Sequence, residues 1–76
     1  MPKFFFNIHC DTYQATDLVG EVCSDAVAAR FEAHRTAREL VREALSNGEF
    51  PQRGWVEVED EQHRPVLILP LKAVAF

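Results

Sequence analysis

The segment 26–45 constrains the fold of this 76-residue chain most, because its composition strongly favours a helix. It holds no glycine or proline and is rich in alanine, glutamate, arginine and leucine, which are strong helix formers. Ser24 or Asp25 can accept hydrogen bonds from the free amides of a first helical turn. Asn47-Gly48 suits the left-handed backbone that ends many helices. The sequence therefore predicts one long helix between these boundaries.

One side of the predicted helix carries small apolar side chains. At 3.6 residues per turn, a stripe forms from Ala26, Ala29, Ala33, Ala37, Leu40, Val41 and Ala44. Because alanine side chains are short, this stripe lets the helix lie close against a sheet. Of the apolar residues that lie off this stripe, Phe31 is the farthest from it. We expect it to pack under a loop, and the alternative is a position that faces a partner.

The N-terminal part of the chain has the pattern of a β-strand and its return. Within residues 3–10, one face collects Phe4, Phe6, Ile8 and Cys10, and the other collects Phe5, Asn7 and His9. Residues 13–16 can return as a short second strand, and residues 17–20 read as another turn.

Two more strands follow the helix. Residues 55–59 alternate, with two valines inward and Trp55 and two glutamates outward, and Pro65 opens a last strand over residues 66–69. The predicted fold class is α+β: a three- or four-stranded antiparallel sheet, ordered strand, strand, helix, strand, strand along the chain, with one long helix on one face. We expect a single domain over residues 1–76, with an apolar C-terminal tail at 71–76.

The last strand has no polar side, and a strand of that kind is normally covered on both faces. One helix covers one face. The far face would show Phe5, Trp55 and either Leu67 with Leu69 or Val66 with Ile68, and a patch of this kind marks an interaction surface. Either the tail folds back over the sheet or a second copy packs on it, and we expect a homodimer. The residues that we expect at the interface are Phe5, Trp55, Leu67, Leu69, Leu71, Val74 and Phe76.

Charge and hydropathy argue against two classes of partner. The formal net charge is −4, and two glutamates flank Trp55 on its face of the strand, which would repel phosphates. We therefore expect no nucleic acid partner. No segment approaches the roughly 18 apolar residues of a membrane span, and the apolar run at 4–6 is far too short for a signal peptide. We expect a cytoplasmic protein with no membrane association, in which Cys10 and Cys23 stay reduced.

Residues with reactive or metal-binding side chains do not form a known pattern. Neither of the close ligand pairs typical of zinc sites, C-x2-C or H-x3-H, occurs, and His9 and Cys10 point to opposite faces of their strand. Cys10 and His34 are the one pair that could be nominated as nucleophile and base, and nothing in the sequence brings them together. The three glycines are too widely spaced for a phosphate loop. We predict no catalytic residue, no metal, no cofactor and no enzyme activity.

Several short motifs together resemble a family of small bacterial proteins whose members commonly begin Met-Pro-basic-aromatic-Phe-Phe-Asn. They are the opening Met1-Pro2-Lys3-Phe4-Phe5-Phe6-Asn7-Ile8, the turn Asp17-x-x-Gly20, the helix end Leu40-Val41-Arg42-Glu43-Ala44-Leu45, and Gly54-Trp55-Val56-Glu57-Val58-Glu59-Asp60 before an apolar strand. The family is a domain of unknown function, so the resemblance implies no catalytic or binding residues. The chain departs from the family at His9-Cys10-Asp11, where a more polar turn is expected.

A weaker similarity, of architecture only, is to HicB-like antitoxin domains, which also place short strands before one long helix. Their Pro-Gly turn before the helix and their DNA-binding segment are missing here. Our leading hypothesis is a non-catalytic protein-interaction module that forms a homodimer through the outer sheet face or the tail. The alternative is an antitoxin-like or regulatory domain that binds a protein partner through the basic flank of the helix around Arg30, His34 and Arg38.

Overall fold

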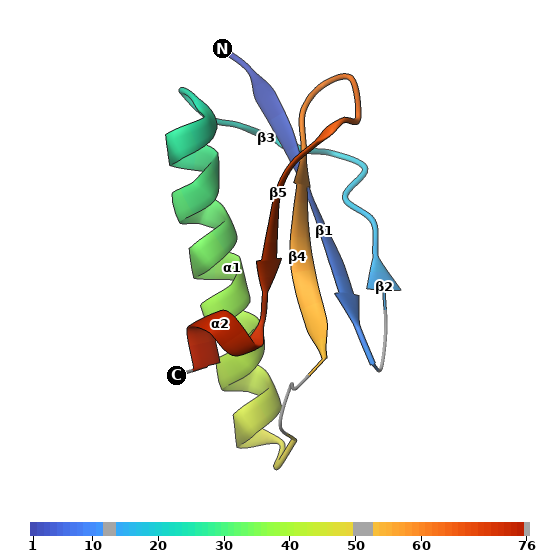
Figure 1. Cartoon of the computed structure of the whole chain (residues 1–76), viewed down its shortest axis with the longest axis vertical. Helices are drawn as coiled ribbons and strands as arrows, with labels where there is room; N and C mark the ends of the chain where they lie inside the picture. The colour runs from blue at the N-terminus through green and yellow to red at the C-terminus, as the bar shows by residue number, and fades with distance from the viewer. Residues whose placement is uncertain (12–13, 50–52, 76) are drawn as a thin grey trace.

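The computed structural model describes residues 1–11, 14–49 and 53–75, and it confirms the predicted α+β class. Figure 1 shows a sheet with one long helix beside it. The elements are β1 (Lys3–Cys10), β2 (Gln14–Ala15), β3 (Glu21–Val22), α1 (Ala26–Ser46), β4 (Gly54–Glu59), β5 (Pro65–Pro70) and α2 (Lys72–Ala75). No helix in these described ranges is long and apolar enough to cross a bilayer.

The sheet is antiparallel and has the order β2-β1-β4-β5, with β3 also paired to β1. It has five strands where the sequence predicts three or four, because the return from β1 is split in two. Ile8 pairs with Ala15 in β2 and Lys3 pairs with Val22 in β3, while the turn at 17–20 separates the two pieces. Residue 13, the first residue of the predicted return, lies outside the described residues.

Helix α1 begins and ends where the local signals place it. The side chain of Asp25 accepts a hydrogen bond from the Ala28 amide at 2.8 Å, so Asp25 is the N-cap. Asn47 is the C-cap, and Gly48 follows with a φ of 76°, which a glycine adopts without steric cost. The amide of Glu49 donates to the carbonyl of Ala44 across this end.

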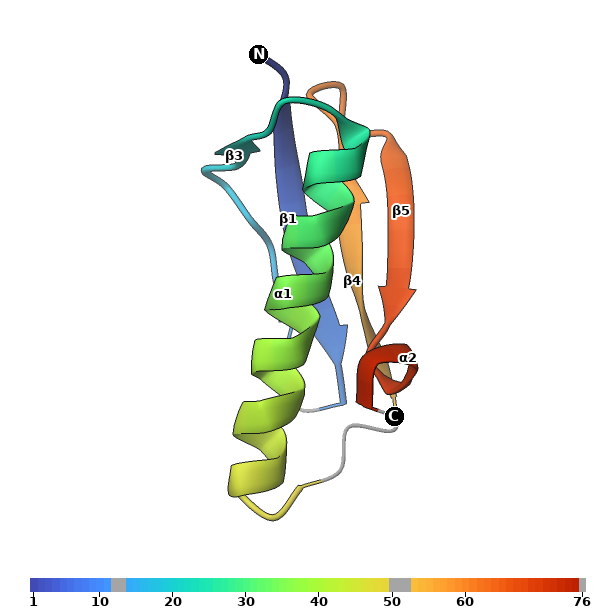
Figure 2. The ribbon, with the colours of Figure 1, turned by 90° about the vertical axis from the view of Figure 1, so that its left-hand side faces the viewer.

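The alanine stripe brings α1 close to the middle of the sheet. Ala33 and Ala37 are fully buried, and so are Val56 and Val58 of β4. Figure 2 shows α1 lying over β1 and β4, with β3 and β5 to either side. Short side chains on the helix and branched side chains on the central strand thus form the core.

The tail packs on the same side of the sheet as α1. Leu71 is buried, its amide donates to the carbonyl of Gly54 at 2.9 Å, and Val74 packs against the core. Figure 2 places the short helix α2 beside the lower half of α1. Our suggestion that the tail could cover the far face of the sheet is therefore wrong for the described part of the tail. Phe76 lies outside the described residues.

The register of β5 decides which of its side chains point outward. Leu67 pairs with Val58 and Leu69 pairs with Val56, so these two leucines share the face that α1 covers. Leu69 is buried and Leu67 packs against the core. The sequence left two outward pairs open, Leu67 with Leu69 or Val66 with Ile68. The outward pair is Val66 with Ile68. Leu67, Leu69, Leu71 and Val74, which we expected at an interface, instead belong to the helix side of the domain.

Candidate interaction surfaces

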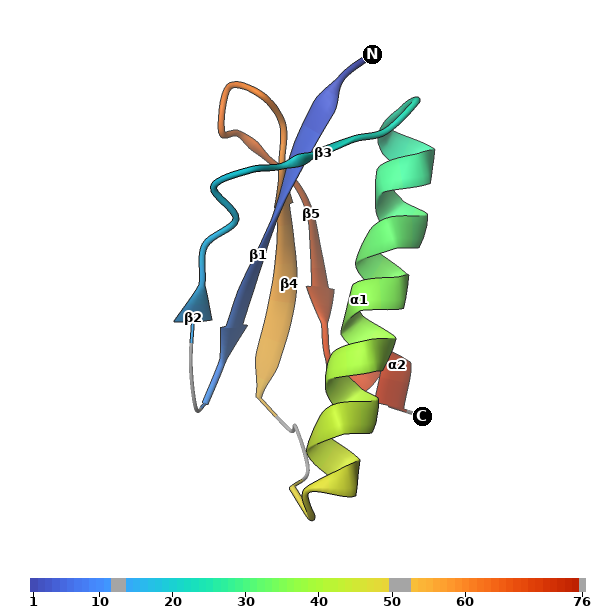
Figure 3. The same cartoon turned by 180° about the vertical axis from the view of Figure 1, so that it is seen from behind.

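The face of the sheet opposite α1 is the first candidate site. We call it the outer sheet face and define it by Phe5, Asn7, His9, Trp55, Glu57, Glu59, Val66 and Ile68. Figures 1 and 3 show α1 and α2 together on the other side of the sheet. Three of its apolar side chains are well exposed: Ile68 at 55%, Val66 at 46% and Trp55 at 40%.

Trp55 is held in a defined orientation on this face. It is the direct cross-strand neighbour of His9, and the two rings stack with centroids 4.9 Å apart and planes 14° apart. The Nε2 atom of His9 lies 3.9 Å from the Oε1 atom of Glu57. Stacked cross-strand pairs stabilise a sheet and restrict the rotamers of both rings. The indole therefore presents a fixed apolar surface beside Ile68.

Asn7 lies at the centre of the outer sheet face and is nevertheless buried, with 6% exposure. Its side-chain amide donates to Glu59 Oε1 at 2.8 Å, and its side-chain oxygen accepts from the amide of Asp17 at 2.9 Å. Because buried polar groups need hydrogen-bond partners, these contacts fix the side chain. Sequence reasoning assigned Asn7 to the outer face and missed this role.

The carboxylate of Asp17 closes the turn at 17–20 against β1. It accepts hydrogen bonds from the amides of Phe6, Val19 and Gly20 at 2.9 to 3.1 Å. Burial raises the pKa of this carboxyl, but the hydrogen bonds from Gly20, Phe6 and Val19 outweigh it, so that the pKa lies below its ordinary value. The Asp17-x-x-Gly20 pattern signalled a turn, and the structure shows how that turn is attached.

His63 reaches back from the β4–β5 hairpin over the same face. Its ring lies 5.1 Å from the ring of Phe5, and its Nδ1 atom is 3.7 Å from Glu59 Oε1. Asp60 organises the hairpin by accepting hydrogen bonds from the amides of Gln62 and Arg64. The amide of Arg64 is the main reason that the pKa of the Asp60 carboxyl is lowered. Phe5 is thus half-covered, unlike Trp55 and Ile68.

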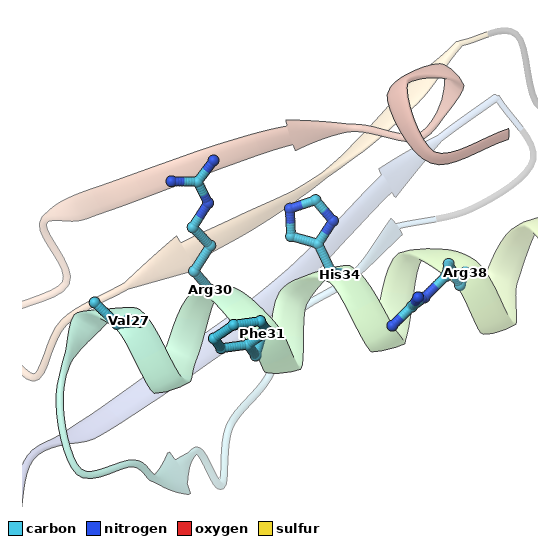
Figure 4. Close-up of a pocket in the computed structure, with 5 residues that line it drawn as sticks. All are labelled: Val27, Arg30, Phe31, His34 and Arg38. Carbon is cyan, nitrogen blue, oxygen red and sulfur yellow. The ribbon is translucent and has the colours of Figure 1, made fainter. Parts of the chain in front are cut away.

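A groove on the exposed flank of α1 is the second candidate site. We call it the helix groove; its volume is about 440 Å³, and it is lined by Val27, Arg30, Phe31, His34 and Arg38. Figure 4 shows Arg30 and His34 extending to the β5 side of α1, with Phe31 beside them. Phe31 is 71% exposed, so the prediction that it packs under a loop is wrong. The spacing of Arg30, His34 and Arg38 already suggested a basic flank.

The residues considered for chemistry do not form a centre. Cys10 ends β1, whereas Cys23 sits at its start, where its amide donates to Pro2. A strand of this length spans roughly 23 Å, which places the Cys10 and Cys23 thiols too far apart for a disulfide within one chain. Burial is the main reason that the pKa of the Cys23 thiol is raised, which keeps the thiol protonated. Across the described ranges, no three His, Cys, Asp or Glu side chains group as metal ligands.

Comparison with known proteins gives one match. A family model described as "Domain of unknown function (DUF6894)" matches residues 3–72. No curated protein and no solved structure matches the chain. The resemblance to a family whose function is unknown is thus confirmed. The similarity to HicB-like domains and the characteristic opening motif gain no support from this match.

Proposed function

The chain belongs to the DUF6894 family, and we propose that this domain is a non-catalytic protein-interaction module that forms a homodimer through its outer sheet face. The observation that supports this most is the position of Trp55, Val66 and Ile68. All three are large apolar side chains, all are at least 40% exposed, and they belong to the outer sheet face. A monomer gains nothing from placing apolar side chains in water there.

The chemistry of the face suits a second copy of itself. In a two-fold dimer the same surface meets itself, so a group away from the axis lies opposite a different group of the partner. The outer sheet face carries two carboxylates, Glu57 and Glu59, and the imidazole of His9, and the hairpin residue His63 adds a second imidazole beside Glu59. A two-fold arrangement can therefore set carboxylates against imidazoles, while the apolar side chains meet at the centre.

The fixed geometry of the face lowers the cost of association. Ordering loose side chains opposes binding, and rings that are already immobile lose less freedom. Trp55 is stacked on His9, and Asn7 and Glu59 are hydrogen-bonded to each other. Full burial of an exposed Ile or similar side chain contributes roughly 1.5–3 kcal/mol, and these three side chains, which are 40% to 55% exposed, have about half of that left to gain. Two copies of three such residues are enough to offset a substantial part of the association entropy.

A measured solution mass tests the proposal. Size-exclusion chromatography with light scattering at micromolar concentration should give twice the chain mass for the wild type. Trp55→Glu and Ile68→Glu should each give the mass of one chain and a normal helical spectrum, because a buried unpaired carboxylate strongly opposes association. Phe31→Glu is the matched control, since it removes an exposed aromatic residue from the opposite side of the domain, and it should leave the dimer intact. A wild type of one chain mass, or a Trp55→Glu variant that still dimerises, contradicts the proposal.

A further inference from the structure

The helix groove combines exposed apolar side chains with the guanidinium groups of Arg30 and Arg38. Val27 and Phe31 are 62% and 71% exposed and stand one turn apart on α1. Arg30, His34 and Arg38 follow each other at intervals of four residues along the same flank. In the part of the chain that the structure describes, neither Arg30 nor Arg38 forms an ion pair or a hydrogen bond, whereas Arg35 and Arg64 pair with Glu32 and Asp60.

The acidic residues of α1 lie on its other flank. At about 100° per residue, Glu32, Glu39 and Glu43 fall on the side of the helix away from Arg30, His34 and Arg38. The helix thus has a basic, partly apolar flank and an acidic flank, although the whole chain carries a net charge of −4. This separation leaves the helix groove with positive potential on an otherwise acidic domain.

We infer that the helix groove is a docking site for an acidic amphipathic helix of another protein. Guanidinium groups bind carboxylates through paired hydrogen bonds. Arg30 and Arg38 are eight residues apart, so their positions differ by about 12 Å along the helix axis. A partner helix laid alongside α1 meets both with carboxylates that are also eight residues apart. An apolar residue between them then packs against Phe31.

Both the apolar and the acidic parts of this partner are required by the groove. An isolated phosphate chain would contact two guanidinium groups and leave Val27 and Phe31 in water, and the net charge of −4 would repel it. An apolar segment without carboxylates would cover Phe31 and leave both guanidinium groups next to low-dielectric surface without a partner, which is unfavourable. Carboxylates that flank an apolar residue give both guanidinium groups a partner and cover Phe31.

A synthetic peptide tests the inference directly. The probe is a fluorescein-labelled helical peptide with two Glu residues eight positions apart and a Leu midway between them, and its binding is followed by fluorescence anisotropy at low salt. The wild-type domain should bind it, and binding should weaken as salt is added. The double variant Arg30→Gln with Arg38→Gln should weaken binding about tenfold, as expected for the loss of two exposed charge pairs, and Phe31→Ser should weaken it to a similar degree.

Two controls make the outcome specific. Arg35→Gln removes the same charge from the same helix at a residue that is paired with Glu32, and it should leave affinity unchanged. A peptide with Lys in place of every Glu should not bind. Equal binding of the Lys peptide, equal loss with Arg35→Gln, or tighter binding of a single-stranded oligonucleotide overturns the inference. The Trp55→Glu variant should still bind the Glu peptide. Loss of the dimer would therefore be seen in the solution mass alone, and an incorrect docking site would be seen in peptide binding alone.

Discussion

Asp17 shows how a single side chain attaches a turn to the sheet. One of its carboxylate oxygens accepts from Phe6, and the other accepts from both Val19 and Gly20. A carboxylate can satisfy these donors because it accepts hydrogen bonds at both oxygens. Its own amide donates to Asn7, whose side chain continues to Glu59 on the next strand. A strand residue, a turn residue and a second strand are thereby linked in one network.

Asp17→Asn should reduce the stability of the domain, and the size of the loss should depend on pH. The new side chain presents an NH2 group toward at least one backbone amide, so the free energy of unfolding at neutral pH should fall by about 1–3 kcal/mol. The pKa of the native carboxyl is lowered from 3.8. The stabilisation by Asp17 is therefore complete above that value and is lost as the pH falls through the lower pKa of the folded state.

Urea denaturation at pH 7 and near pH 3 measures this difference. The gap between the wild type and Asp17→Asn should narrow at the lower pH, because only the wild type loses the contribution of the carboxylate there. Asp11→Asn removes the same charge at an exposed position and should have little effect at either pH. A gap for Asp17→Asn that is the same at both values would show that the charged form of Asp17 carries no special stabilisation.

At the scale of elements, the helix and the strand whose patterns are set by residues close in sequence were predictable. Helix α1 has an unbroken run of helix formers with a cap at each end, so its predicted and observed bounds differ by one residue. The bounds of β1 were predicted without error, because apolar side chains recur at every second position from Phe4 to Cys10. The bounds of both elements are set by residues close in sequence, so local patterns are sufficient to predict them.

Features that depend on distant contacts were not predictable. Strand β5 is apolar on both faces, so only its pairing with β4, which sets Ile68 opposite Glu57, identifies the outward row. Val66 lies at the register shift beside Val58 and Glu59 and is 46% exposed. The apolar composition of the tail does not indicate which side of the sheet it packs on. It packs on the helix side, where the amide of Leu71 donates a hydrogen bond to the carbonyl of Gly54 at the start of β4. Of the candidate surfaces, Phe5 and Trp55 were assigned to the correct face. The burial of Asn7 and the contact of His63 with Phe5 had no signal in sequence spacing.

The close approach of α1 to the sheet gives a prediction for the helix as a whole. Ala33→Leu adds three carbon atoms where the native side chain is fully buried against β4. The helix must then move outward or the added side chain must take a strained rotamer, so the free energy of unfolding should fall by about 1–3 kcal/mol. Thermal denaturation measures the loss. Ala26→Leu makes the same substitution at the first residue of the predicted stripe, which the structure shows to be exposed. An equal loss for both would mean that α1 is not tightly packed at Ala33.

At the scale of the whole molecule, the domain is a two-layer structure with different chemistry on its two sides. Its shortest principal extent is 16 Å, which leaves room for the sheet and one layer of helices. The helix side presents cations and Phe31, and the sheet side presents carboxylates, imidazoles and Trp55. The two proposed sites lie on opposite sides of the sheet, so one copy can hold both partners at the same time.

The small size of the domain links its stability to its proposed dimer. A chain of this length has a thin stability margin, and binding of a second folded copy adds to that margin by mass action. Each tenfold rise in concentration should stabilise the dimer by about 0.7 kcal/mol per chain and raise the Tm by roughly 3–6 °C. Trp55→Glu should have a Tm that does not change with concentration, and Phe31→Glu should keep the dependence of the wild type. A constant wild-type Tm across a wide range of micromolar concentrations would contradict a dimer coupled to folding.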